Sequence, residues 1–134
     1  YGAFKLALSH PDRYAAAASL SGALAPDPTL SKDNEKRRLQ MECIFGDLDT
    51  FDGSENDLLH LAKQMKHTGE EQPALFACCG TEDFLYEQNQ QFRCYAKSVG
   101  LGLDYEEGPG THEWGFWDKW IQRVLEWLPV NERD

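Results

Sequence analysis

Two short segments of this 134-residue chain place an acid and a histidine where such residues could do chemistry. Asp83 follows an apolar run that ends at Cys79-Gly80, and His112 follows the turn residues Gly108-Pro109-Gly110, 29 positions later. A histidine that takes a proton from a hydroxyl needs a carboxylate to hold one tautomer and to stabilise its cation. Ligands bind at the carboxyl ends of the strands in open parallel sheets. The spacing therefore predicts His112 as a general base and an acid of the first segment, Asp83 or its neighbour Glu82, as the group that orients it.

The neighbours of these two residues have alternative interpretations. Glu82 is a rival to Asp83 but is expected to be a solvated loop residue. Trp114 either lines a substrate pocket or packs the start of the last helix, and Phe84 either lines the same pocket or packs in the core. The other histidines lie at a predicted helix end or within a helix and are expected to be structural or surface residues: His10, His60 and His67.

Hydrophobic spacing and turn residues predict the elements of the first half. An apolar helical turn stops near His10-Pro11, because proline disfavours helical backbone in the residue before it. The small and apolar run from Tyr14 to Leu20 suits a buried parallel strand. Residues 25–38 are rich in Pro, Asp, Lys and Arg and are expected to form a loop. Ser54-Glu55-Asn56-Asp57 resembles a capping box ahead of an amphipathic helix that Gly69 ends.

The second half alternates strands and helices. Pro73 to Cys79 is predicted as a strand, and residues 85–98 as a helix closed by Gly100. A third strand around Tyr105 leads into the Gly108–Gly110 turn, and a long amphipathic helix runs from Trp114 to Leu128. The full order is helix, strand, loop, helix, strand, helix, strand, helix. Such alternation predicts an α/β fold with parallel strands and right-handed crossover helices.

Two motifs give the chain a resemblance to a known family. The segments Cys79-Gly80-Thr81-Glu82-Asp83-Phe84-Leu85-Tyr86 and Gly110-Thr111-His112-Glu113-Trp114-Gly115-Phe116-Trp117 resemble the acid and histidine motifs of the esterase D group of α/β-hydrolases. Bacterial tributyrin esterases and acetylesterases fit best, because the H-x-W-x-x-W spacing is less typical of formylglutathione hydrolases. The resemblance implies that Asp83, rather than Glu82, is the acid of a Ser–Asp–His triad. It also implies hydrolysis of short-chain, acetyl-type esters without a cofactor.

The resemblance further implies that the nucleophile lies outside these residues. Tyr1-Gly2-Ala3-Phe4 resembles the segment directly after the family's nucleophile elbow, G-x-S-x-G-G, and the strand ending at Ser21-Gly22 resembles the next strand of that fold. We therefore expect residues 1–134 to be the C-terminal portion of a single α/β-hydrolase domain, without the nucleophile strand, the elbow or the oxyanion hole. Such a chain is expected to be inactive alone, since little rate enhancement remains without these parts.

The serines inside the chain are poor substitutes for that nucleophile. Ser21 lacks the glycine two residues before it, and Ser54 is better explained as a helix cap. Ser9 and Ser98 lie at predicted helix ends.

Composition excludes several other classes. The net charge of −10 disfavours nucleic acids and anionic membrane surfaces as partners, because both require basic patches. No apolar run is long enough to span a membrane. The cysteines lack zinc-site spacing, and the Cys78-Cys79 pair is expected as buried, reduced thiols of a cytoplasmic protein.

Two hypotheses of different class remain. In the first, the chain is part of a serine carboxylesterase that binds a small ester. In the second, it is a degenerate, non-catalytic hydrolase module used for binding or assembly. In both, the missing nucleophile strand leaves an apolar sheet edge, which invites association with another copy or with the missing N-terminal half.

Overall fold

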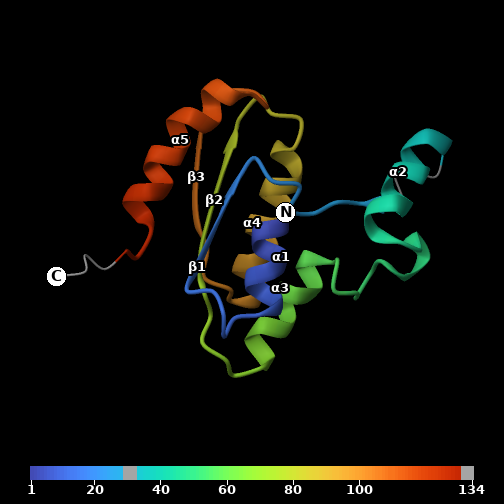
Figure 1. Ribbon diagram of the computed structural model, residues 1–134, viewed down its shortest axis with the longest axis horizontal. Coiled ribbons are helices and arrows are strands. Elements are labelled where there is room, and N and C mark those ends of the chain that lie inside the picture. Colours follow the sequence, from blue (N-terminus) through green and yellow to red (C-terminus); the bar gives the residue numbers. More distant parts are fainter. Residues whose placement is uncertain (29–32, 131–134) are drawn as a thin grey trace.

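The computed structural model describes residues 1–28 and 33–130, which form a parallel sheet with helices on both faces (Figure 1). The elements follow in the order α1 (Gly2–Ser9), β1 (Ala16–Leu20), α2 (Glu35–Phe45), η2 (Leu48–Thr50), α3 (Leu58–His67), β2 (Ala74–Gly80), α4 (Tyr86–Val99), β3 (Asp104–Gly108) and α5 (Trp114–Trp127). The predicted α/β fold with parallel strands is confirmed, and each predicted strand is present within a few residues of its expected bounds.

The sheet has the strand order β1-β2-β3, and both pairings are parallel. Ala16 pairs with Ala74, and Phe76 pairs with Asp104. Strands that are adjacent both in sequence and in space require crossovers of one hand, which place α3 and α4 on the same face. All three carboxyl ends meet at one edge of the sheet, and the loops after β2 and β3 lie side by side there.

The central strand β2 is buried on both faces, and its alternating side chains separate two cores. Leu75 and Ala77 face the helices α1, α3 and α4. Phe76 and Cys78 face α5, where Phe116 and Val124 cover them. Among the described helices, α1, α3 and α4 pack on one face of the sheet and α5 packs on the other. The chain therefore passes over the carboxyl edge of the sheet between β3 and α5 (Figure 1). That crossing carries His112.

Helix α2 has no counterpart among the elements expected from the sequence. The expected loop over residues 25–38 is wrong at its end, because α2 begins at Glu35 with Asn34 as its N-cap. The Asn34 side chain accepts a hydrogen bond from the backbone N–H of Arg37, at 3.0 Å. No residue of α2 is buried. Its apolar residues are spread around the helix rather than gathered on one face, so it lacks the stripe by which helices are recognised in sequence.

The predicted capping box at residues 54–57 is also wrong. Asp57, not Ser54, is the N-cap of α3, and its carboxylate accepts from the backbone N–H groups of Leu59 and His60. Ser54 instead accepts a hydrogen bond from the backbone of Asn56 at 3.2 Å. Asp57 directly precedes the apolar residues of α3, so the cap lies three residues later than the S-x-x-D pattern suggested.

Two further findings concern the thiols and the length of the helices. Cys78 and Cys79 are fully buried, whereas Cys43 and Cys94 are exposed. Across residues 1–28 and 33–130, no helix combines the length and the apolar character needed to cross a bilayer.

Candidate active site

Asp83 lies in a tight turn directly after β2. Its backbone N–H donates to the carbonyl of Gly80 at 3.1 Å, and its own carbonyl accepts from Tyr86 at 3.0 Å. The side chain is completely buried. One carboxylate oxygen, Oδ1, accepts from the backbone N–H of Leu85 at 2.8 Å, and the other, Oδ2, faces His112. The turn and the Leu85 N–H together fix the direction of the carboxylate.

His112 lies in the loop between β3 and α5, with its Nδ1 atom 3.0 Å from Asp83 Oδ2. An ionised carboxylate can only accept hydrogen bonds, so this contact places the proton on Nδ1 and leaves Nε2 with a free lone pair. About a third of the imidazole is exposed (33%), while the carboxylate has no exposure. A fixed tautomer with an accessible Nε2 is what a general base requires.

The loops that carry these two residues are in direct contact. Thr81 N–H donates to the carbonyl of Gly108 at 2.9 Å, and Glu82 N–H donates to that of Gly110 at 3.1 Å. A Cβ atom on Gly80 would lie 2.1 Å from the Gly110 carbonyl oxygen, so no larger residue fits there without movement. Gly110 has a φ of +148° and faces the ring of Phe116, and both features favour glycine.

Glu82 forms no hydrogen bond with His112. Of the two acids, Asp83 meets the imidazole, whereas Glu82 meets the backbone of the neighbouring loop. The Glu82 carboxylate is exposed, as expected, but it accepts from Gly110 N–H and from the Thr81 hydroxyl, each at 2.7 Å. The Gly110 N–H, and after it the Thr81 hydroxyl, lowers the pKa of Glu82.

Aromatic rings surround the imidazole. Phe84 lies 4.7 Å from it between ring centroids, and Trp117 meets it edge-on at 4.8 Å. Trp114 packs edge-on against Trp117 at 5.1 Å. Phe84 is 77% exposed, so its core-packing alternative is wrong. Trp114 is 81% exposed and packs against Trp117 at the start of α5, which is the packing alternative expected for it from the sequence.

Two residues of this cluster form a hydrogen bond that sequence reasoning does not predict. Trp117 lies within the predicted amphipathic helix, and its indole N–H donates to Ser21 Oγ at 3.1 Å. Ser21 is buried and has a φ of +52°, a left-handed conformation that is uncommon for a residue with a side chain. The positive φ could not be predicted from sequence, although a polar residue next to Gly22 at a strand end is a weak signal of a tight turn.

Ser21 is not placed as the nucleophile. Its Oγ accepts from the Trp117 indole N–H, and within the described part of the chain no serine hydroxyl is hydrogen-bonded to His112. The Ser98 hydroxyl donates to the carbonyl of Tyr95 within α4. The described residues also contain no cluster of three or more His, Cys, Asp or Glu side chains suited to a metal ion.

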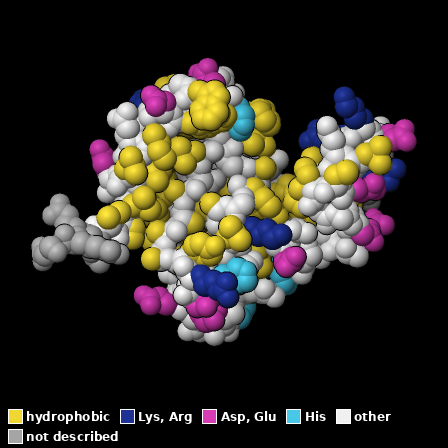
Figure 2. Space-filling view, viewed as in Figure 1, with side chains coloured by type: hydrophobic (Ala, Val, Ile, Leu, Met, Phe, Trp, Pro, Cys, Tyr) yellow, Lys and Arg dark blue, Asp and Glu magenta, His cyan; other side chains and the backbone are white. Residues whose placement is uncertain are grey.

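An apolar groove adjoins the aromatic cluster. Its volume is about 530 Å³, and its walls come from the end of β1 and the first two turns of α5: Leu20, Trp114, Gly115, Trp117, Asp118 and Ile121. Hydrophobic side chains gather over the part of the surface where α5 lies (Figure 2). Since Trp117 touches both His112 and this groove, the groove can hold an apolar group next to the imidazole.

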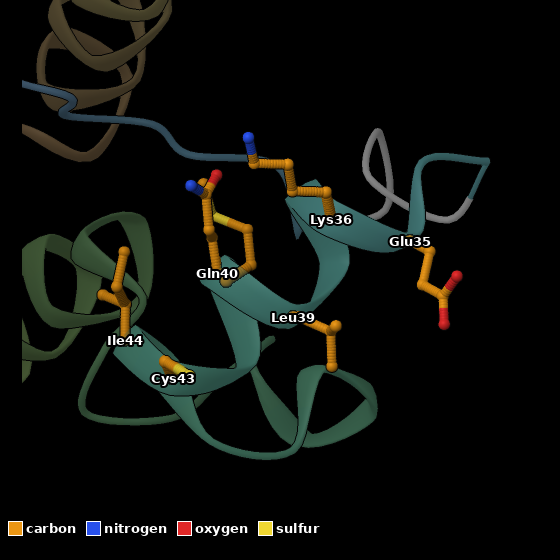
Figure 3. Close-up of a pocket in the computed structure, with 7 residues that line it drawn as sticks. Glu35, Lys36, Leu39, Gln40, Cys43 and Ile44 are labelled. Carbon is orange, nitrogen blue, oxygen red and sulfur yellow. The ribbon is translucent and has the colours of Figure 1, made fainter.

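A larger hollow of about 660 Å³ lies on α2 (Figure 3). The described residues that line it all belong to that helix, among them Leu39, Cys43 and Ile44. Helix α2 stands apart from the sheet, on the side of the molecule away from α5 (Figure 1). Glu35 and Lys36 at the rim point in different directions (Figure 3), so they form no convergent polar site. The Asp83–His112 region is the better candidate.

Comparisons with known proteins concern the fold and the sequence. No family model matches the chain. An acetyl esterase from Caldicellulosiruptor saccharolyticus is 29% identical over 133 residues, a match that covers 96% of this chain and 50% of the esterase.

Two solved structures from Staphylococcus aureus are similar as well. The S-formylglutathione hydrolase FrmB is 32% identical, with a TM-score of 0.79 over 95% of this chain and 49% of the hydrolase. The fluorophosphonate-binding serine hydrolase FphF is 30% identical, with a TM-score of 0.82 over 98% of this chain and 51% of the hydrolase. The chain thus spans about half the length of the relatives it matches. It has the fold of half an α/β-hydrolase, and over nearly its whole length it resembles the esterase D-like members of that class, both acetyl esterase and S-formylglutathione hydrolase.

Proposed function

We propose that this chain supplies the acid and the general base of a serine carboxylesterase that hydrolyses short-chain, acetyl-type esters. The observation that carries the proposal is the 3.0 Å contact between a fully buried Asp83 carboxylate and a partly exposed His112 imidazole. The similarity to an acetyl esterase and to a serine hydrolase supports the reaction class.

The reaction would proceed through an acyl-enzyme. A serine hydroxyl attacks the ester carbonyl while His112 Nε2 takes its proton, and Asp83 stabilises the imidazolium that forms. The tetrahedral intermediate collapses as His112 returns the proton to the departing alcohol oxygen. Water then attacks the acyl-serine, His112 takes its proton in turn, and the carboxylic acid leaves as the serine regains a proton from His112.

The serine in this proposal comes from a segment joined to Tyr1. A Cβ built on Gly22 would lie 3.0 Å from the Tyr1 backbone nitrogen, so such a segment would enter beside the end of β1. Two buried polar atoms close to Gly22, Ser19 Oγ and Asn89 Oδ1, have no hydrogen-bond partner among the described residues. Backbone N–H groups of an entering segment would satisfy them. On this proposal, residues 1–134 are inactive without that segment.

The exposed aromatic residues suggest how the ester is held. Phe84 packs against the imidazole, Trp114 packs against Trp117, which meets the same imidazole, and we assign Phe84 and Trp114 to substrate binding. The groove beside Trp114 is lined almost entirely by apolar groups, with Asp118 as its one acidic residue. An uncharged acyl or alkyl group of small size would fit it better than a charged one.

The test uses the longer protein that contains this chain, assayed with p-nitrophenyl acetate and butyrate. Substituting Asp83→Asn would present an amide N–H to His112 Nδ1 and reverse the tautomer, and in a serine-protease triad this change lowers kcat about 10⁴-fold. We expect a loss in kcat of about 10⁴-fold for Asp83→Asn and of about 10⁶-fold for His112→Ala, because removing the base of such a triad costs about as much as removing all three residues. The exposed His67, in the last turn of α3, provides the control His67→Ala, which should leave kcat unchanged. Activity retained in His112→Ala would overturn the assignment.

A second candidate is a non-catalytic module used for binding or assembly. The observation that favours it is the lack of a serine hydroxyl at His112 within the described residues. The sequence upstream of Tyr1 discriminates between the two. A G-x-S-x-G elbow there supports the esterase, and its absence supports the binding module.

The location and partners of the protein are also proposals. Strand β1 pairs only with β2 within the described residues, so its other edge offers backbone groups for pairing. We propose that a preceding segment or a second copy of the chain covers this edge. The two buried thiols of β2 suit a reducing compartment, and on that ground we place the protein in the cytoplasm.

A further inference from the structure

Glu82 ties together the two loops that carry the proposed acid and base. Its carboxylate accepts from the backbone N–H of Gly110 at 2.7 Å, and its own backbone N–H donates to the Gly110 carbonyl at 3.1 Å. The Thr81 hydroxyl donates to the same carboxylate oxygen at 2.7 Å and holds it in place. One residue of the acid loop therefore satisfies both backbone groups of Gly110, two positions before His112.

The loop that carries His112, residues 108–113, forms few other hydrogen bonds. Between Gly108 and Glu113, the loop forms one internal backbone bond, from Glu113 N–H to the Thr111 carbonyl at 3.0 Å. Its remaining backbone bonds to the acid loop are those of Gly108 to Thr81 and of Gly110 to Glu82. Gly110, which the Glu82 side chain binds, lies two residues before His112. Apart from the His112–Asp83 contact itself, this is the side-chain hydrogen bond between the two loops that lies nearest to His112 along the chain.

We infer that Glu82 is a positioning residue that sets the distance and direction of the His112 ring relative to Asp83. The value of this role for catalysis rests on the proposed esterase function, whereas the positioning itself does not. A charged acceptor suits the task, because hydrogen bonds to an ionised carboxylate are shorter and stronger than those to a neutral group. The bonded oxygen also accepts two donors at once, which orients it for Gly110.

The inference is tested on the 134-residue chain by proton and nitrogen NMR with labelled histidine. A His112 Nδ1–H that donates to Asp83 gives a slowly exchanging, downfield proton signal, which His112→Gln identifies by its loss. In Glu82→Ala we expect exchange of this proton to speed up roughly tenfold to a hundredfold, the factor that loss of a hydrogen bond to a charged group represents. Glu82→Gln keeps one oxygen for Gly110 and should restore most of the protection.

The matched control is Glu113→Ala. Glu113 lies next to His112, is exposed, and makes no capping hydrogen bond with its side chain, so its removal changes net charge equally without touching Gly110. Protection in Glu82→Ala equal to that in Glu113→Ala would overturn the inference. If thermal melting shows that Glu82→Ala does not fold, Glu82→Gln serves as the test instead. Rapid exchange of the His112 Nδ1 proton in a folded Glu82→Gln variant would contradict the inference, because this variant is expected to keep most of the protection.

The same variants separate this inference from the proposed function. In the longer protein, Glu82→Ala should lower kcat with little change in KM, because it displaces the base and not the substrate. An esterase that is indifferent to His112→Ala would refute the proposed function while the NMR result stands. An active esterase whose Glu82→Ala variant keeps both its kcat and its protected proton would refute the positioning role alone.

Discussion

Gly80→Ala is the substitution for which the structure gives the clearest expected effect. The added Cβ would lie 2.1 Å from the Gly110 carbonyl oxygen and 2.6 Å from the carbonyl carbon, whereas ordinary contacts begin at 3.4 Å. The two loops must therefore separate by about 1.3 Å, since both atoms belong to the backbone and cannot rotate away. A shift of that size along the Asp83–His112 contact would lengthen it from 3.0 Å beyond hydrogen-bond distance.

The cost combines two effects. Overpacking of a buried contact costs about 1–3 kcal/mol, and weakening of a hydrogen bond to a charged group adds to it. We expect a total loss of about 3–6 kcal/mol in the free energy of unfolding. For a domain of this size, that corresponds to a drop in Tm of roughly 12–24 °C. Thermal melts by circular dichroism measure it, and the protected His112 proton should disappear.

Gly115→Ala is the control for this prediction. A Cβ on Gly115 would meet no atom within 4 Å, and the residue lies in the first turn of α5. Alanine in a helix is favoured over glycine by up to about 1 kcal/mol, so this variant should melt at or slightly above the wild-type temperature. Equal melting of Gly80→Ala and Gly115→Ala, with the His112 proton intact in both, would show that the loops are not in the close contact described.

Two further predictions concern other parts of the molecule. Burial raises the pKa of Cys78 to about 12 and that of Cys79 to about 11, from 9.0. Because both folded pKa values lie above the unfolded one, this contribution to stability is full below pH 9 and is lost as the pH rises toward 12. Urea titrations at about pH 7, 9 and 10.5 should show it, and replacing both thiols with Ala should flatten the decline. Light scattering tests the edge of β1, for which we expect a concentration-dependent dimer of residues 1–134 and would take a strict monomer as evidence against edge pairing.

The strands and the acid–histidine pair could be predicted because their signals are local. An apolar run followed by Gly80, and a glycine-rich turn before His112, mark the carboxyl ends of neighbouring strands. Parallel topology then brings those ends together without further information. The choice of Asp83 over Glu82 came from the family resemblance alone. In the structure the two carboxylates have different partners, His112 for Asp83 and the Gly110 backbone for Glu82.

The features that could not be predicted depend on contacts across the fold. Helix α2 buries no residue, so hydrophobic periodicity gives no sign of it. In the sequence, Trp117 is one of several apolar residues of an amphipathic helix. Its hydrogen bond to Ser21 becomes evident only in the folded structure. The task of Glu82 is equally invisible in sequence, because its partner is a backbone N–H whose position depends on the turn at Gly110.

The hydrogen bond between Trp117 and Ser21 has a consequence for the order in which the site is assembled. Asp83 and His112 are 29 residues apart, whereas Ser21 and Trp117 are 96 residues apart. Closing the longer loop costs about 1 kcal/mol more in chain entropy. During folding, the β2–α4–β3–α5 unit can therefore bring acid and base together first, and the indole closes against β1 afterwards. Mutations at Ser21 would then speed unfolding far more than they slow folding. The indole of Trp117, which packs against His112, would be the last part of the site to reach its native position.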